Sequence, residues 1–144
     1  MIVYLCGPIT GHPSDFEWRT LATQLLHDGG AEVLDPLRGK DAAKISADGL
    51  CYDGKLADPG FALRDRQDVQ RCDALLCCVQ RLPPTRPLWG TPWELGWASA
   101  WGKRIVIATV FVSLGQHLFT VAFAEAVFAE IEDAVAAILA PRKE

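Results

Sequence analysis

The chain has 144 residues, of which 50% are hydrophobic, and a formal net charge of −4. This length and apolar content predict one compact domain over residues 1–144 with a substantial core. The scattered basic residues form no stripe of the kind that binds nucleic acid, and no apolar run approaches the roughly 18 residues of a membrane span. Without a targeting signal either, we expect a soluble, cytoplasmic protein with no nucleic-acid or membrane partner.

Short apolar runs without polar alternation predict buried strands at residues 2–6, 31–34, 74–80 and 104–110. Helical patterns are expected at residues 14–27, at 62–71, around Glu94, and at 118–139, the last continuous or broken. Strands of this kind joined by helices predict an α/β fold of three layers, a Rossmann-like sandwich with a parallel sheet covered on both faces. The long stretch 37–62 has no sustained periodicity, which is typical of a functional lid or a mobile segment.

The helix at residues 14–27 has Phe16, Leu21, Leu25 and Leu26 as its expected core-facing side chains. Its start is expected at Ser14 or Asp15, either of which can cap a helix.

One carboxylate stands out in the stretch LWGTPWELGWASAWGK, residues 88–103. Thr91 suits a helix N-cap, Pro92 suits the first helical position, and Glu94 follows the cap by three residues. One interpretation is a capping box, in which Glu94 accepts a hydrogen bond from the backbone NH of Thr91. The other is a functional acid, because the loop delivers Glu94 between a buried strand and a buried helix, where α/β folds bind ligands.

The same helix carries Trp93, Trp97 and Trp101 at intervals of four residues, with Trp89 just before it. Such a stripe lies along one side of a helix and is most often core. A buried subunit interface is the competing interpretation, since interfaces are enriched in tryptophan.

The cysteines and histidines predict no metal site. Four of the five cysteines (Cys6, Cys72, Cys77 and Cys78) lie in or beside apolar runs without CxxC spacing, as expected of small buried side chains in a reducing compartment. The three histidines are far apart and lack ligand spacing, so we expect no metal dependence.

Two further features are expected at the carboxyl ends of the strands. The run YLCGPITG, residues 4–11, is a strand entering a loop in which Gly7 and Gly11 permit close approach of a ligand and Thr10 adds a hydroxyl. The helix at 62–71 carries Asp65 and Asp68; a solvated acidic face is the simpler interpretation of Asp68. Asp73, at the junction with the next strand, is expected to be structural.

Three features together resemble the nucleoside 2-deoxyribosyltransferase family, in their order and spacing over roughly residues 2–110. They are YLCGPITG, an aspartate (Asp65) eight residues before the CD pair at Asp73, and GTPWELGWASAWGK. The resemblance implies a flavodoxin-like parallel sheet, a homodimer or higher homo-oligomer with shared active sites, and no metal or organic cofactor. It implies that deoxynucleosides and free nucleobases are the substrates. It also implies that Glu94 is the nucleophile, that Asp65 binds deoxyribose and that Tyr4 orients the nucleophile.

The sequence departs from the family at Leu88, where transferases often have an acid that contacts the base and phosphate-dependent hydrolases have a serine. Phe16 and Trp18 are candidates for stacking on a base. The family also borrows a polar residue from a neighbouring subunit, for which Gln116 and His117 are the candidates here. The expected catalytic residues are Glu94, Tyr4 and Asp65, and the candidate substrate contacts are Gly7, Pro8, Ile9, Thr10, Phe16, Asp68, Leu88, Gly90, Thr91, Gln116 and His117.

The leading function is therefore exchange of nucleobases on 2′-deoxyribose through a covalent deoxyribosyl-Glu94 intermediate. The alternative is an N-glycoside hydrolase of 2′-deoxynucleosides or nucleoside 5′-monophosphates, for which Thr10, the loop NH groups and Arg64 are the evident phosphate contacts. The cytokinin-activating phosphoribohydrolases share a Gly-Thr-x-x-Glu pattern, but their PGG lead-in is missing here. A non-catalytic nucleotide-binding module is disfavoured by the match at Glu94, Asp65 and Tyr4.

Overall fold

A five-stranded parallel sheet forms the centre of the computed structural model, which describes residues 1–84 and 87–142. In spatial order its strands are β2 (Glu32–Leu34), β1 (Ile2–Cys6), β5 (Ala74–Val79), β6 (Arg104–Thr109) and β7 (Ala126–Phe128). Every pairing between neighbouring strands in this sheet is parallel. This strand order is that of the flavodoxin-like folds, so the α/β expectation is confirmed.

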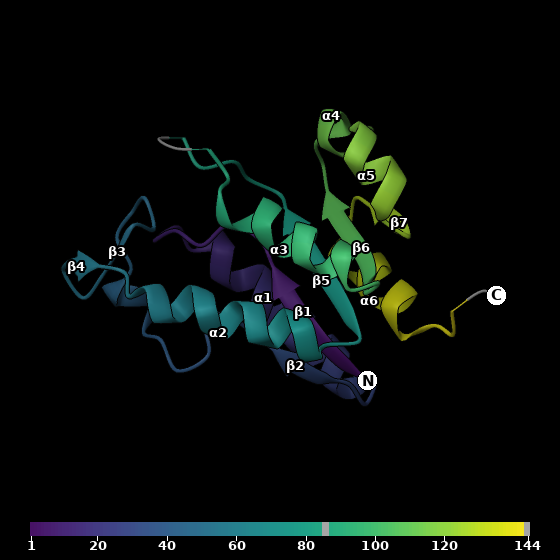
Figure 1. The fold of residues 1–144 in the computed structure, drawn as a ribbon, viewed down its shortest axis with the longest axis horizontal. Helices are drawn as coiled ribbons and strands as arrows, with labels where there is room; N and C mark the ends of the chain where they lie inside the picture. Colours follow the sequence, from purple (N-terminus) through teal and green to yellow (C-terminus); the bar gives the residue numbers. More distant parts are fainter. Residues whose placement is uncertain (85–86, 143–144) are drawn as a thin grey trace.

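Helices cover both faces of the sheet (Figure 1). One face packs against α1 (Ser14–Asp28) and α6 (Ile131–Leu139), the other against α2 (Pro59–Arg71) and α3 (Gly90–Ala100). Because both faces are covered, all six residues of β5 are buried, which explains why the strand sequences lack polar alternation. None of the described helices is long and apolar enough to cross a membrane.

The chain changes direction between β1 and β5. From β1 it passes through α1 to the outer strand β2, and from β5 it passes through α3 to β6 on the opposite side. The loops that leave β1 and β5 therefore diverge at the carboxyl ends of these two strands. Open α/β sheets bind their ligands at this kind of switch point.

The structure corrects several expected elements. The helix expected at 118–139 is instead α5 (Leu118–Phe123), strand β7 and α6, preceded by a short helix α4 (Val112–Gly115). The break occurs because the chain turns extended at Ala124, and residues 126–128 then complete the sheet against β6. In the stretch 37–62, a 3-10 turn (Ala42–Lys44) precedes an antiparallel pair, β3 (Cys51–Tyr52) and β4 (Lys55–Leu56). Helix α2 begins three residues earlier than expected, since Asp58 caps it and Pro59 takes its first position.

Helix α1 buries polar rather than purely apolar residues. Leu21, expected in the core, is exposed, whereas Asp15 and Arg19 are buried beside Ala22 and Leu26. The guanidinium of Arg19 donates to the carbonyl oxygens of Leu5 (3.2 Å) and Gly7 (3.1 Å) and to the Asp35 carboxylate (3.1 Å). Arg19 thus satisfies the backbone where β1 ends, and it ties that end to the segment after β2.

We predict that Arg19→Met lowers the free energy of unfolding by about 3 kcal/mol, because the substitution keeps most of the volume but leaves Asp35 and two buried carbonyls without their donor. Urea unfolding measures the change. The control is Arg71→Met: Arg71 pairs with Asp68 through an exposed side chain, and its loss should cost less than about 1 kcal/mol. Equal losses in the two variants would contradict the role given to Arg19.

Candidate functional site

Glu94 lies in the second turn of α3 and points at the sheet. Its Oε1 accepts a hydrogen bond of 2.8 Å from the hydroxyl of Tyr4, in the middle of β1, and the residue is only 8% exposed. The helix begins at Gly90, and no side chain caps it. The capping-box interpretation is therefore wrong, because Thr91 lies inside the helix and the Glu94 carboxylate bonds to the sheet instead.

The surroundings of Glu94 bring the pKa of its carboxyl group close to neutral pH. Burial raises the pKa of Glu94 from 4.5 to about 7, against the hydrogen bonds from Cys6 and Tyr4, which favour the carboxylate. Burial and the neighbouring Glu94 raise the pKa of Tyr4 well above its ordinary value, so Tyr4 stays protonated and remains a donor. A carboxyl group whose pKa is shifted toward neutrality is typical of catalytic acids, bases and nucleophiles.

Asp65, on α2, is the second carboxylate of this region, and the two carboxylates influence each other's charge. Its side chain is 13% exposed, and its Oδ1 is buried without a hydrogen bond from any residue that the structure describes. The guanidinium of Arg64 lies 3.7 Å from that oxygen. Burial raises the pKa of Asp65 to about 6, although Lys40 and Arg64 favour its charged form. A buried acceptor without a donor fits a ligand hydroxyl.

The loop after β1 packs tightly against β5. A Cβ on Gly7 would lie 2.4 Å from the carbonyl oxygen of Cys78, so only glycine fits there. The Thr10 hydroxyl donates to Asp15 at 2.5 Å and accepts from Arg81 at 2.8 Å and from the His12 amide at 3.1 Å. Thr10 therefore holds the loop together within the chain. Pro8 is buried in this loop, and Ile9 is half-buried.

Asp68, Phe16 and Asp73 contact other parts of the chain. Asp68 is buried and pairs with Arg38 (2.5 Å) and Arg71 (3.1 Å), so it is not part of a solvated face. Phe16 lines a hollow of about 320 Å³ beside α1 together with Asp35 and Leu37. Asp73 is structural as expected, since it accepts a hydrogen bond from the amide of Ile2.

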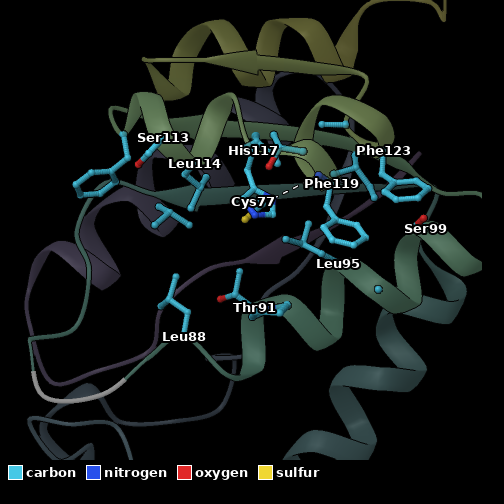
Figure 2. A pocket seen from close by; sticks show the side chains of 18 of the residues that line it. Cys77, Leu88, Thr91, Leu95, Ser99, Ser113, Leu114, His117, Phe119 and Phe123 are labelled. Atoms are coloured by element: carbon cyan, nitrogen blue, oxygen red, sulfur yellow. Dashed lines mark hydrogen bonds between the residues drawn. The ribbon is translucent and has the colours of Figure 1, made fainter.

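A larger apolar groove of about 790 Å³ runs between α3 and the α4–α5 segment. Figure 2 shows Thr91, Leu95 and Ser99 of α3 facing Leu114, His117 and Phe119 across it. Glu94 is not among the residues that line this groove, whereas Thr91, one helical turn before it, is. Leu88 also lines the groove, while Gly90 and Gln116 are exposed.

The tryptophan stripe is only partly buried. Trp97 and Trp101 pack against the core, but Trp89 and Trp93 are mostly exposed and line a second hollow with Pro92. The core interpretation is therefore wrong for Trp93.

Sequence reasoning missed the polar residues that support the site: Cys6, Arg19, Lys40 and Arg81. Arg81 follows β5 by two residues, so its position at a strand end was visible in the sequence. The partners of Arg19 are backbone carbonyls, which no pattern of side chains reveals. Within residues 1–84 and 87–142 there is no group of three or more His, Cys, Asp or Glu side chains that could hold a metal ion.

Comparisons with known proteins agree with this geometry. The model of the nucleoside 2-deoxyribosyltransferase family matches residues 3–118. No curated protein sequence matches the chain. Among solved structures, the chain is similar to a 2-deoxyribosyltransferase of Bacillus psychrosaccharolyticus, with a TM-score of 0.70, 17% identity, and coverage of 100% of this chain and 99% of the other.

Two further solved structures share the fold. A 2-desoxiribosyltransferase of Leishmania mexicana has a TM-score of 0.69 and 18% identity, with 96% of each chain covered. A CMP N-glycosidase of Clostridium botulinum has a TM-score of 0.58 and 16% identity, with 96% of this chain and 98% of the other covered.

We predict that Glu94→Gln stabilises the protein relative to wild type by about 2 to 3 kcal/mol more at pH 8 than at pH 5. The pKa of Glu94 is raised in the folded state, so its favourable contribution is present below the unfolded pKa of about 4.5 and is lost as the pH rises through about 7. The neutral amide avoids this loss. Urea unfolding at the two pH values measures the difference, and an equal difference at both would contradict the burial of an ionisable Glu94.

Proposed function

This chain belongs to the nucleoside 2-deoxyribosyltransferase family, and we propose that it exchanges nucleobases on 2′-deoxyribose with Glu94 as the nucleophile. The main support is the Glu94 carboxylate, which is buried at the switch point between β1 and β5 and accepts a hydrogen bond from Tyr4. It lies near a second carboxylate, Asp65, whose Oδ1 has no hydrogen-bond donor among the described residues.

The proposed reaction has two displacement steps. A carboxylate oxygen of Glu94 attacks the anomeric carbon while the bond from carbon to the base nitrogen breaks; the electron pair goes to the departing base, which takes a proton from solvent. A nitrogen of a second base then attacks the same carbon, gives up its proton, and releases the carboxylate. Two inversions retain the configuration, as in retaining glycosidases.

Tyr4 and Asp65 have separate roles in this proposal. The Tyr4 hydroxyl, 2.8 Å from Glu94, fixes the direction of the carboxylate. The donor-free Oδ1 of Asp65 accepts a hydrogen bond from a deoxyribose hydroxyl. The pKa of Glu94 near 7 keeps a useful fraction ionised at neutral pH and makes the reaction pH-dependent.

Hydrolysis of the N-glycosidic bond is the second candidate, with water in place of the second base. Arg81 favours it, because this cation lies at the loop after β1, beside Thr10 and Asp15, and its side chain is 27% exposed, so that a phosphate group can approach the guanidinium. The structural similarity to a CMP N-glycosidase is consistent with this candidate.

We predict that the wild-type protein converts deoxyinosine and adenine into deoxyadenosine and hypoxanthine, and that Glu94→Ala lowers the rate at least about 1,000-fold, since a covalent nucleophile has no substitute. Chromatography of the products measures both. The control is Glu17→Ala, which removes an exposed carboxylate from the first turn of α1 and should leave the rate unchanged. Free deoxyribose without deoxyadenosine would contradict exchange and support hydrolysis, and an active Glu94→Ala would exclude Glu94 as nucleophile in either reaction.

We also propose that two or more copies associate through the α3–α5 face. This face consists of the groove between α3 and α4–α5 and the exposed apolar side chains on its two sides: Leu118, Phe119, Val121 and Phe123 on α5, and Trp89 and Trp93 at α3. Continuous apolar surface of this kind marks an association site. His117 lines the groove of this face, and the exposed Gln116 directly precedes it in the chain. We therefore propose that they contribute to the site of a neighbouring copy.

We predict that Phe119→Glu reduces the molar mass measured by light scattering to that of a single chain and lowers the exchange rate, because a charge replaces a ring that is 66% exposed on the α3–α5 face. Leu56→Glu is the control, since Leu56 is also apolar and exposed but lies on β4, away from this face. An active wild-type monomer at assay concentration would contradict the proposal.

A further inference from the structure

Arg64 is a cation beside Asp65 that the proposed exchange reaction leaves unused. The two residues are neighbours on α2, and Nη2 of Arg64 lies 3.7 Å from Oδ1 of Asp65. This distance is that of an ion pair but is too long for a hydrogen bond, and Oδ1 has no hydrogen-bond donor among residues 1–84 and 87–142. Arg64 therefore brings a positive charge to Asp65 without occupying its buried oxygen.

The turn that follows β2 holds the guanidinium of Arg64 in this place. Nη2 donates to the carbonyl oxygen of Pro36, and Nη1 donates to that of Arg38 at 3.4 Å. The planar, forked guanidinium reaches both backbone acceptors at once, which an ammonium group on a flexible stem does less well. The turn thus fixes the position of the charge that lies near Asp65.

We propose that Arg64 is a positioning residue for Asp65, an inference that rests on the sugar-binding role proposed for Asp65. The guanidinium, fixed to the turn after β2, keeps the buried carboxylate ionised and leaves Oδ1 open to accept a hydrogen bond from a sugar hydroxyl. A direct hydrogen bond from Arg64 would stabilise the same charge but would compete with the sugar for the oxygen. An ionised acceptor binds a hydroxyl more strongly than a neutral one does.

Other charged groups also act on Asp65. Besides Arg64, they are Lys40 and Arg38 of the turn after β2, Asp68 of α2 and Glu94 of α3. Lys40 favours the charged form, whereas Arg38 and Asp68 form an ion pair, so that their opposite effects offset each other. Burial still raises the pKa of Asp65 to about 6. Loss of one neighbouring cation therefore leaves this carboxyl group partly protonated near neutral pH.

A purely structural role for Arg64 makes a different prediction. If the guanidinium only joins α2 to the turn after β2, its replacement lowers stability but leaves the pKa of Asp65 unchanged. A cation beside the carboxylate favours the charged form, so its removal raises that pKa.

The experiment follows the pKa of Asp65 by carbon NMR in the full chain labelled at the aspartate carboxyl carbons, with the Asp65 signal assigned from its absence in Asp65→Asn. We expect Arg64→Gln, which keeps an amide donor for the turn but removes the charge, to raise this pKa by about half a unit or more. Arg64→Lys keeps the charge, and its Asp65 pKa should stay near the wild-type value. The control is Arg66→Met, which should leave the pKa unchanged, because Arg66 is exposed and its guanidinium lies over the Trp101 ring.

Activity gives a second measurement, which rests on the proposed function. Because the pKa of Asp65 is about 6 in wild type, about half of the carboxyl groups are ionised at pH 6 and nearly all at pH 8. Arg64→Gln should therefore lower kcat/KM for the deoxynucleoside about two- to five-fold at pH 6, through KM rather than kcat, and leave it near the wild-type value at pH 8.

An unshifted Asp65 pKa in Arg64→Gln overturns the inference, as does an equal loss of kcat/KM at pH 6 and pH 8. If Arg64→Gln does not fold, an Asp65 pKa raised by about half a unit or more in Arg64→Lys overturns it. If wild type shows no exchange or hydrolysis, the proposed function fails, while the NMR titration still decides whether Arg64 keeps Asp65 ionised.

Discussion

The hydrogen bond between the Tyr4 hydroxyl and the Glu94 carboxylate joins β1 to α3 where the helix packs on the sheet, and the chemistry proposed for Glu94 depends on it. Burying a carboxylate is costly unless hydrogen bonds compensate it. Here the donors come from β1, while α2 brings Asp65, a like charge that opposes ionisation. The result is a carboxyl group whose pKa is near 7, suited to change its charge and its bonding during a reaction.

The position of this bond follows from the topology of the sheet. Only where the chain turns away from β1 on one side and from β5 on the other do the loops separate enough to admit a ligand. Gly7 allows the loop after β1 to lie against β5, and Arg19 satisfies the carbonyls that β1 leaves at its end. The loop after β1 and the side of α1 that packs on the sheet therefore depend on buried polar contacts.

The sequence predicted the buried strands, because a parallel sheet covered on both faces needs continuous apolar runs. It did not predict β7, since AVF at residues 126–128 continues a helix-compatible apolar stretch, and only pairing with β6 makes it a strand. Glu94 was identified, but its bond to Tyr4 rather than to the Thr91 amide depends on a contact across 90 residues. The burial of Asp15 and Arg19 likewise depends on partners that only the folded chain brings near.

In the proposed mechanism, Glu94 forms a covalent bond with the sugar. The most direct measurement incubates the protein with a deoxynucleoside and no acceptor base, quenches it in acid, and locates any added deoxyribosyl mass by peptide mass spectrometry. We expect the adduct on Glu94 and its disappearance when a free base is supplied before quenching. An adduct on Asp65, or turnover with no adduct on any residue, would contradict it.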